Sequence, residues 1–255
     1  MMEKFDSSYI VKMTMKAKEK WKPSKYIYKK GKLKASRDRN KVAIELRLIC
    51  DLIAKIYDDN IKKYVTGKLL DLGCGSVPLY IAYKDYIDDN ICIDWHKNDY
   101  IDHCHNLIEK LPLNDEIFDT VIMSDVLEHI PEPEMIISEI YRVLKLNGKL
   151  LLNVPFYYCI HEAPHDFYRF TEFALRYLLE KVGFKIIKLE FIGGPVEVIA
   201  DVIIKNTAHI SLLGNPLAIF LQWITLLYTK TKIGKKINRA AAHKFPLGYF
   251  VVGVK

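Results

Sequence analysis

The fold class is decided by the stretch Leu69-Leu70-Asp71-Leu72-Gly73-Cys74-Gly75-Ser76-Val77-Pro78. Its first half is an apolar run ending on an acid, which is typical of a short buried strand. Two glycines at alternate positions then permit a tight turn in which the backbone comes close to a ligand. A helix opening after the turn would direct its free N–H groups at an anionic group such as a carboxylate. The stretch therefore predicts the first strand of an α/β sheet with a nucleotide-type crevice at its carboxyl end.

The glycine spacing excludes two other phosphate-binding turns. A dinucleotide-binding turn follows G-x-G-x-x-G, but Pro78 stands in place of the third glycine. A P-loop is excluded because no Gly-Lys-Ser/Thr follows. The D-x-G-x-G core from Asp71 to Gly75 instead resembles motif I of the class I S-adenosylmethionine-dependent methyltransferases, which usually carry another glycine at the position of Val77. The resemblance implies a Rossmann-like α/β fold: a seven-stranded, mostly parallel sheet with an antiparallel last strand and helices on both faces.

A second strand is predicted over residues 90–94, and it ends on Asp94. Asp94 follows Gly75 by 19 residues, the length of an ordinary strand–helix–strand unit. Its carboxylate is expected to accept both ribose hydroxyls of a bound nucleoside, with Trp95 against the adenine. A lone acid at this place would otherwise be read as a helix cap or turn residue, and its position after motif I favours the cofactor role.

The family resemblance continues downstream. Residues 117–124 form an apolar, β-branched run expected to be a buried strand. The segment Asp125-Val126-Leu127-Glu128-His129-Ile130 resembles the D-V-L-E-H segment of small-molecule methyltransferases. A helix should then begin near Pro131 and Pro133 and end at Asn147-Gly148. Residues 149–155, 184–190 and 248–254 are expected to form strands five, six and seven.

The resemblance also assigns cofactor contacts. Gly73 and Gly75 would line the methionine and ribose of S-adenosylmethionine, while Asp71 would orient its amino group. Ser124 would lie along the sulfonium. By position, the Asn106 side chain and the Leu107 backbone N–H would recognise adenine. For Asn106 the capping of a turn is the alternative.

A segment dense in titratable and aromatic groups, residues 155–171, follows the fifth strand. It resembles the H-x-x-P-x-D-(Y/F)-x-R-(Y/F)-T stretch of methyltransferases met in polysaccharide and cell-envelope biosynthesis. The resemblance implies a small-molecule, saccharide or lipid-linked acceptor, methylated on oxygen or nitrogen. A hydroxyl acceptor must lose its proton, and a neutral imidazole can accept one near pH 7.

Three histidines, His129, His161 and His165, are therefore the catalytic candidates. Asp166 and Arg169 are equally well explained as an ion pair that fixes the segment.

Two alternative functions remain open. Asp125, Glu128 and His129 resemble the acid-x-x-Glu-His set of quinone-biosynthesis O-methyltransferases, in which a divalent cation would lower the pKa of a bound hydroxyl. A helix start explains Glu128 without any metal, and no metal site is assigned. A non-catalytic, methyltransferase-like scaffold at the membrane is the other alternative.

Composition indicates one α/β domain with additions. The chain has 255 residues, half of them apolar, enough for a full core. Five cysteines form no C-x-x-C pair and are expected to be reduced thiols of a cytoplasmic protein. The first twenty residues lack an apolar run, so no signal peptide is expected. The predicted boundaries are a basic N-terminal arm over 1–41 and the catalytic domain over 42–255, with an apolar helical insertion at about 196–245.

Charge and hydropathy single out two regions. Residues 1–41 carry a net charge of +10, against +7 for the whole chain, and this arm could bind anionic lipid or form a lid over the cofactor. Nucleic acid is not the expected partner.

Residues 206–229 contain no Asp, Glu, Lys or Arg and are interrupted by Gly214-Asn215-Pro216. They predict a hairpin of apolar helices, either over the cleft or dipping into one leaflet, in a peripherally membrane-bound protein.

Overall fold

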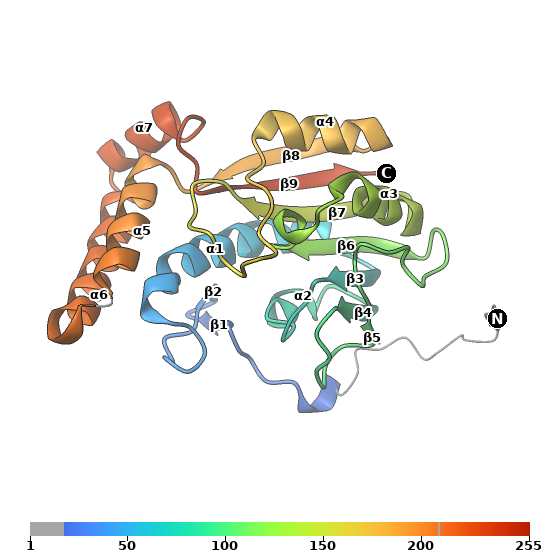
Figure 1. Ribbon diagram of the computed structural model, residues 1–255, viewed down its shortest axis with the longest axis horizontal. Coiled ribbons are helices and arrows are strands. Elements are labelled where there is room, and N and C mark those ends of the chain that lie inside the picture. The colour runs from blue at the N-terminus through green and yellow to red at the C-terminus, as the bar shows by residue number, and fades with distance from the viewer. Residues whose placement is uncertain (1–17, 209) are drawn as a thin grey trace.

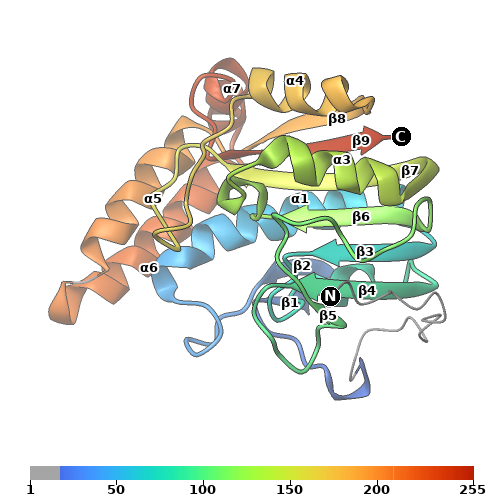
Figure 2. The same cartoon turned by 45° about the vertical axis from the view of Figure 1, so that its right-hand side comes forward.

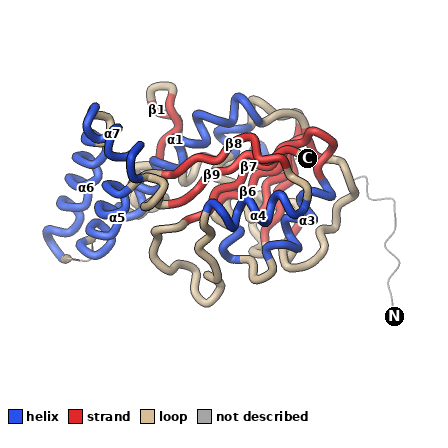
Figure 3. Tube along the Cα trace, turned by 90° about the horizontal axis from the view of Figure 1, so that it is seen from above, coloured by secondary structure: helices blue, strands red, loops and turns tan. Residues whose placement is uncertain are grey.

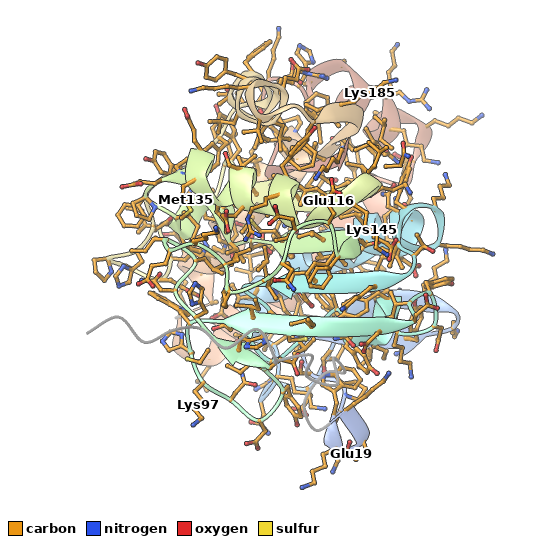
Figure 4. The ribbon with its side chains drawn as sticks, turned by 90° about the vertical axis from the view of Figure 1, so that its right-hand side faces the viewer. Glu19, Lys97, Glu116, Met135, Lys145 and Lys185 are labelled. Atoms are coloured by element: carbon orange, nitrogen blue, oxygen red, sulfur yellow. The ribbon has the colours of Figure 1, made fainter. Side chains whose placement is uncertain are left out.

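The computed structural model describes residues 18–208 and 210–255 (Figure 1). At its centre is a seven-stranded sheet with the strand order β5-β4-β3-β6-β7-β9-β8. The strands are β3 (Lys68–Leu72), β4 (Asp89–Asp94), β5 (His103–Cys104), β6 (Phe118–Ser124), β7 (Leu144–Pro155), β8 (Lys185–Ile192) and β9 (Gly248–Val254). Figure 4 shows Lys185, the first residue of β8, and Lys97, which follows β4, at opposite ends of the molecule.

The strand directions confirm the predicted fold class. β3 pairs in parallel with both β4 and β6, and β6 pairs in parallel with β7. β9 is antiparallel to β7 on one side and to β8 on the other. The parallel strands end at the same edge, so the loops after β3, β4, β6 and β7 meet there.

Helices cover both faces of the sheet. α1 (Arg47–Tyr64) lies on one face, and α3 (Pro133–Val143) and α4 (Glu172–Val182) lie on the other (Figures 2 and 3). Two separate apolar clusters correspond to these two layers. The inward residues of α3 recur at helical spacing: Ile136, Ile137, Ile140 and Val143.

The helix expected to end at Asn147-Gly148 is shorter than predicted. Pro133 begins α3 as expected, but the helix ends at Val143 and β7 begins directly at Leu144. Asn147 has φ 65° and its N–H donates to the Lys255 carbonyl, so the Asn-Gly pair forms an irregularity inside a long strand. The prediction was wrong because the same turn residues serve a bend in a strand as well as a helix end.

The described part of the basic arm packs onto the domain. β1 (Tyr26–Lys29) and β2 (Lys32–Ala35) form an antiparallel hairpin beside α1. Its side chains Tyr26, Leu33 and Ala35 are buried in the α1 cluster. Packing therefore continues across the boundary predicted at residue 41, while residues 1–17 of the arm lie outside the described residues.

Three helices form the insertion between β8 and β9: α5 (Pro195–Thr207), α6 (Ser211–Tyr228) and α7 (Lys232–Ala241). A helical hairpin is present, but its turn is not at Gly214-Asn215-Pro216 as predicted. That triplet lies within the first turns of α6, and the chain reverses before Ser211 instead. Pro216 is the sixth residue of α6 and lacks the N–H that would donate to the Leu212 carbonyl, so the helix continues through it with one backbone hydrogen bond fewer.

Among the described residues, no single helix has both the length and the apolar composition expected of a membrane span. Only α6 and α7 taken together, bent by 89° at their junction, reach the required length and apolar composition.

Candidate active site

A cavity of about 460 Å³ opens at the carboxyl edge of the parallel strands. This volume lies within the range of small-molecule sites. Its lining includes motif I residues from the turn after β3, Ser124 and Asp125 after β6, and two side chains from the N-terminal hairpin region. Its lining residues include Lys25, Tyr26, Asp71, Gly73, Gly75, Ser124, Asp125, His129, Tyr158 and His161.

Motif I forms the predicted turn. Gly73 has φ 65° and Gly75 φ 52°, a region that favours glycine. A Cβ on Gly73 would overlap the Val126 side chain, whereas a Cβ on Gly75 would meet only open space. Val77 is fully buried and also left-handed at φ 53°, an unusual conformation for a β-branched residue. Glycine would adopt this conformation without strain, which explains the family preference at this position.

The helix expected to follow the turn does not reach it. α2 (Tyr80–Tyr83) has only four residues and begins five positions after Gly75. Turns occupy the chain between them. The expectation that a helix N-terminus faces an anionic ligand here is therefore wrong, because too few aligned peptides are present to supply a dipole.

Asp94 ties the end of β4 to motif I. Its Oδ2 accepts a hydrogen bond from the Gly75 N–H at 2.8 Å and its Oδ1 accepts one from the His96 N–H at 2.8 Å. Each carboxylate oxygen has a second lone pair, so the group can still accept ribose hydroxyls. Trp95 follows with its ring exposed and its edge against His165, with centroids 5.0 Å apart.

The two adenine candidates lie on the loop after β5, and neither lines the cavity. Leu107 is buried, while Asn106 is exposed and its Oδ1 accepts a hydrogen bond from the Ile108 N–H at 3.3 Å. This contact corresponds to the turn-capping alternative for Asn106.

Two acids with raised pKa values face the cavity. Burial raises the pKa of Asp71 to about 7, even though the Tyr83 hydroxyl donates to its Oδ2 at 2.9 Å. Burial also raises the pKa of Asp125 to about 6, against the opposing effect of the nearby Lys25 ammonium. Asp125 is held by the Asn153 amide, which donates to its Oδ1 at 2.6 Å. Buried acids of this kind suit a ligand that carries positive charge.

Glu128, His129 and His161 form a cluster beside the cavity, with ligand-type atoms all within 4.8 Å of one another. The Glu128 Oε1 lies 3.7 Å from His129 Nε2 and 3.6 Å from His161 Nε2. These distances exceed those of hydrogen bonds. Glu128 has 0% exposure, and among the described residues neither of its carboxylate oxygens has a hydrogen-bond partner. A buried carboxylate without a hydrogen bond is costly, which makes the cluster a candidate functional site.

The outer nitrogen of His129 has a hydrogen-bond partner, whereas that of His161 has only a nearby carboxylate. His129 Nδ1 lies 2.7 Å from the His165 carbonyl oxygen, so Nδ1 carries the proton and Nε2 is free to accept one. His161 Nδ1 lies 3.3 Å from Asp166 Oδ2. Burial would lower the pKa of His161, but the Glu128 and Asp166 carboxylates together raise it above its ordinary value.

Asp166 and Arg169 form the ion pair that was the structural alternative. Both guanidinium NH groups donate to the Asp166 carboxylate, at 2.6 and 2.7 Å, and Arg169 holds the pKa of Asp166 well below its usual range. The pair also fixes the backbone at His161, since the Asp166 carboxylate accepts a hydrogen bond from the His161 backbone N–H at 2.9 Å. The loop is fixed further because the Phe167 N–H donates to the Glu128 carbonyl.

Of the three predicted histidines, the structure brings His129 and His161 to the cavity and leaves His165 outside it. The exposed His165 ring packs against Trp95, and its contribution to the cluster is the backbone carbonyl. Sequence reasoning missed Lys25 and Asn153, because no local motif marks residues that reach the site from distant segments. Tyr158 lies in the segment 155–171 that the sequence singled out, but only the histidines of that segment were taken as candidates.

The comparisons with known proteins agree with this geometry. Residues 70–152 match the family model described as a methyltransferase domain. The chain is similar to the solved structure of an S-adenosylmethionine-dependent methyltransferase from Archaeoglobus fulgidus, with 17% identity, a TM-score of 0.51, and coverage of 78% of this chain and 93% of that one. A putative methyltransferase from Bacillus halodurans gives 14% identity, a TM-score of 0.52 and coverages of 80% and 98%. A comparison with curated protein sequences gave no match.

Another similar structure is that of a protein named for a different chemistry. The [4+2]-cyclase SpnF gives 19% identity, a TM-score of 0.52, and coverage of 81% of this chain and 82% of that one. Structural likeness at these identities therefore shows the fold alone, and the assignment as a methyltransferase depends on the family match over residues 70–152. S-adenosylmethionine carries an ammonium and a sulfonium, and the buried acids of the cavity fit such a cationic group. The chain thus contains a methyltransferase domain of the class I fold, and it is an S-adenosylmethionine-dependent methyltransferase.

Proposed function

We propose that the enzyme methylates a hydroxyl oxygen and that the cluster of Glu128, His129 and His161 receives the hydroxyl proton. The observation that carries this proposal is the Glu128 carboxylate, which is fully buried between two imidazoles beside the cavity and accepts no hydrogen bond from the part of the chain that the structure describes. A nitrogen acceptor that is already deprotonated would not require such a base.

The proton path follows from the hydrogen bonds of the cluster. When bound, S-adenosylmethionine supplies a methyl group whose bond to sulfur breaks, leaving the electron pair on sulfur, as the bond to the acceptor oxygen forms. His129 presents Nε2 as an acceptor because its Nδ1 proton is held by the His165 carbonyl. The acceptor's proton moves to this Nε2, and the imidazolium is stabilised by Glu128 at 3.7 Å. Burial makes this stabilisation stronger than it would be in water.

For the acceptor we propose a saccharide or lipid-linked molecule. Three aromatic side chains of the loop after β7, Tyr157, Phe167 and Tyr168, are exposed near the site. Flat aromatic faces of this kind can cover a sugar ring or an apolar chain while hydroxyls reach the cavity. The resemblance of residues 155–171 to methyltransferases of cell-envelope biosynthesis supports the same class.

Transfer of labelled methyl groups into cell extracts tests the acceptor class. We expect label in the saccharide or lipid fraction, attached through an ether bond that resists mild acid and base. Label in the nucleic-acid or protein fraction alone would contradict the proposal.

Substitution of the cluster tests the base. Glu128→Gln and His129→Gln should each lower the transfer rate by about 10²- to 10⁴-fold while leaving S-adenosylhomocysteine affinity unchanged. Glu134→Gln is the matched control, because Glu134 is an exposed glutamate that pairs with Lys181 at 2.7 Å outside the site. A Glu128→Gln enzyme with the wild-type rate would refute the role of this cluster.

A divalent cation is the second candidate for activating the hydroxyl. Two imidazole nitrogens and one carboxylate within 4.8 Å make a suitable ligand set, and a carboxylate behind His161 is typical of metal-bound histidines. Asp125, which was expected in this set, is engaged by Asn153 instead, and His161 takes its place. Loss of turnover in chelator that magnesium or manganese restores would favour the metal. Full activity in chelator would leave the imidazole base as the mechanism.

A further inference from the structure

α6 has its polarity reversed relative to the helix of an ordinary water-soluble domain. Its buried stripe consists of small or polar residues at helical spacing: Gly214, Ala218, Gln222 and Thr225. The Gln222 amide donates to the Ile44 carbonyl in the interior. Its outer side is apolar and includes Leu213, Phe220, Trp223 and Leu227, all exposed. A surface helix in water normally shows the opposite arrangement.

α5 shows the same reversal. Its inward residues include two acids, Glu197, which accepts hydrogen bonds from the Asn238 amide, and Asp201, which pairs with Lys205. Its outer residues Ile199 and Val202 are 61% and 54% exposed. α5 and α6 pack side by side and project beyond the carboxyl ends of the parallel strands (Figures 1 and 2). On these two neighbouring helices large apolar side chains are exposed, and exposed apolar surface of this kind marks an interaction site.

α7 adds positive charge next to this surface. It turns by 89° from α6 and exposes Lys232, Lys235, Lys236 and Arg239. Within residues 18–208 and 210–255, none of these four cations forms an ion pair with an acid. A surface pocket lies among them, lined by cationic side chains. Ile233 and Ile237, also exposed, lie on the same helix four residues apart.

We infer that the outer side of α5, α6 and α7, here called the docking face, binds the surface of an anionic lipid bilayer. The apolar side chains of α5 and α6 would enter the boundary between headgroups and acyl chains, and the α7 cations would contact lipid phosphates. α6 has 18 residues, about 27 Å, and the reversed polarity fits an interfacial hairpin rather than a crossing.

The docking face is connected to the active-site loop. The Lys205 ammonium of α5 lies 3.5 Å from the centre of the Tyr158 ring, and Tyr158 lines the cofactor cavity. Behind α7, the Phe245 ring packs 5.9 Å from Tyr157 on the same loop. A bilayer on the docking face would therefore lie on the side of the molecule where the acceptor must enter.

Charge favours a bilayer over a second copy of the chain as the occupant. After Asp201 the sequence contains no acidic residue, so the docking face carries cations and no anions. In a symmetric dimer the same patch meets itself, and the α7 cations would have no opposing charge. An anionic bilayer supplies both the apolar phase and the negative surface that the face requires.

Co-sedimentation with vesicles tests the inference without reference to methyl transfer. The full chain should bind vesicles of phosphatidylcholine with phosphatidylglycerol, and it should bind pure phosphatidylcholine vesicles much more weakly. Phe220→Ser with Trp223→Ser should lower the partition coefficient by about tenfold for each side chain. Lys232→Glu, Lys235→Glu and Lys236→Glu should each lower it by about 30-fold on anionic vesicles, because each reversal changes the charge by two units, and by less at high salt.

Matched controls are available elsewhere on the surface. Phe173→Ser on α4 removes an aromatic side chain that is 72% exposed but lies off the docking face. Lys62→Glu with Lys63→Glu reverses two exposed cations at the end of α1. These variants should bind vesicles as the wild type does, and all variants should keep wild-type affinity for S-adenosylhomocysteine, which shows that they are folded.

Two results would overturn the inference. One is wild-type protein that stays in the supernatant with anionic vesicles at low salt. The other is a stable dimer that Phe220→Ser with Trp223→Ser converts to monomers, with neither species binding vesicles, since that would make the docking face a protein interface. Retained transfer activity in either case would leave the proposed function standing.

Discussion

Replacement of Asp71 by asparagine should change how the stability of this protein depends on pH. Asp71 is 3% exposed, and burial raises its pKa to about 7, compared with 3.8 for a free side chain. The difference of about three units corresponds to about 4 kcal/mol, which is the cost of ionising the buried carboxyl. Asparagine keeps the shape and an oxygen that can accept from the Tyr83 hydroxyl, but it never ionises.

The sign follows from proton uptake. Between pH 4 and pH 7 the unfolded chain has already lost the Asp71 proton while the folded protein retains it, so stability falls as pH rises. Urea unfolding should show the wild type losing up to about 4 kcal/mol relative to Asp71→Asn across this interval, with no further change above it. The exposed Asp88→Asn, near the start of β4, provides the baseline. A difference between wild type and Asp71→Asn that stays constant from pH 4 to pH 8 would refute the reasoning.

Three further substitutions test other parts of the structure. Asp94→Ala should weaken S-adenosylhomocysteine binding about 100-fold in calorimetric titration, since the carboxylate fixes motif I and is predicted to accept the ribose hydroxyls. Unchanged affinity would remove Asp94 from the cofactor site. Leu33→Ala should lower the free energy of unfolding by about 2 to 5 kcal/mol, because Leu33 is buried against α1; a change below about 0.5 kcal/mol would mean that the hairpin does not belong to the core. His161→Asn should lower the free energy of unfolding below pH 6.5, where the wild type has a stabilisation that it loses as pH rises through the raised pKa of this imidazole. Identical dependence of unfolding on pH in the two proteins would contradict the role of the nearby Glu128 and Asp166 carboxylates.

Motif I and the strands were predictable because the signals that encode them are local. The run from Leu69 to Gly75 requires only a buried strand followed by a turn with positive φ at its glycines, and both are observed. The antiparallel last strand followed from the family resemblance. Predictions about the ends of helices were less accurate. Asn147-Gly148 bends a strand, and Gly214-Asn215-Pro216 lies inside α6, because turn residues permit a break without requiring one.

The fold class, the glycine turn of motif I and the set of candidate histidines could all be predicted from local patterns in the sequence. That His129 and His161 meet Glu128 while His165 lies outside the cavity depends on tertiary packing. These residues come from segments more than thirty positions apart, and the long-range hydrogen bonds to the carbonyls of Glu128 and His165 set their arrangement. The same holds for α6, whose apolar composition is visible in the sequence. Which side of it faces the protein depends on the packing of Gly214, Ala218 and Gln222, and that packing leaves the large apolar side chains outside.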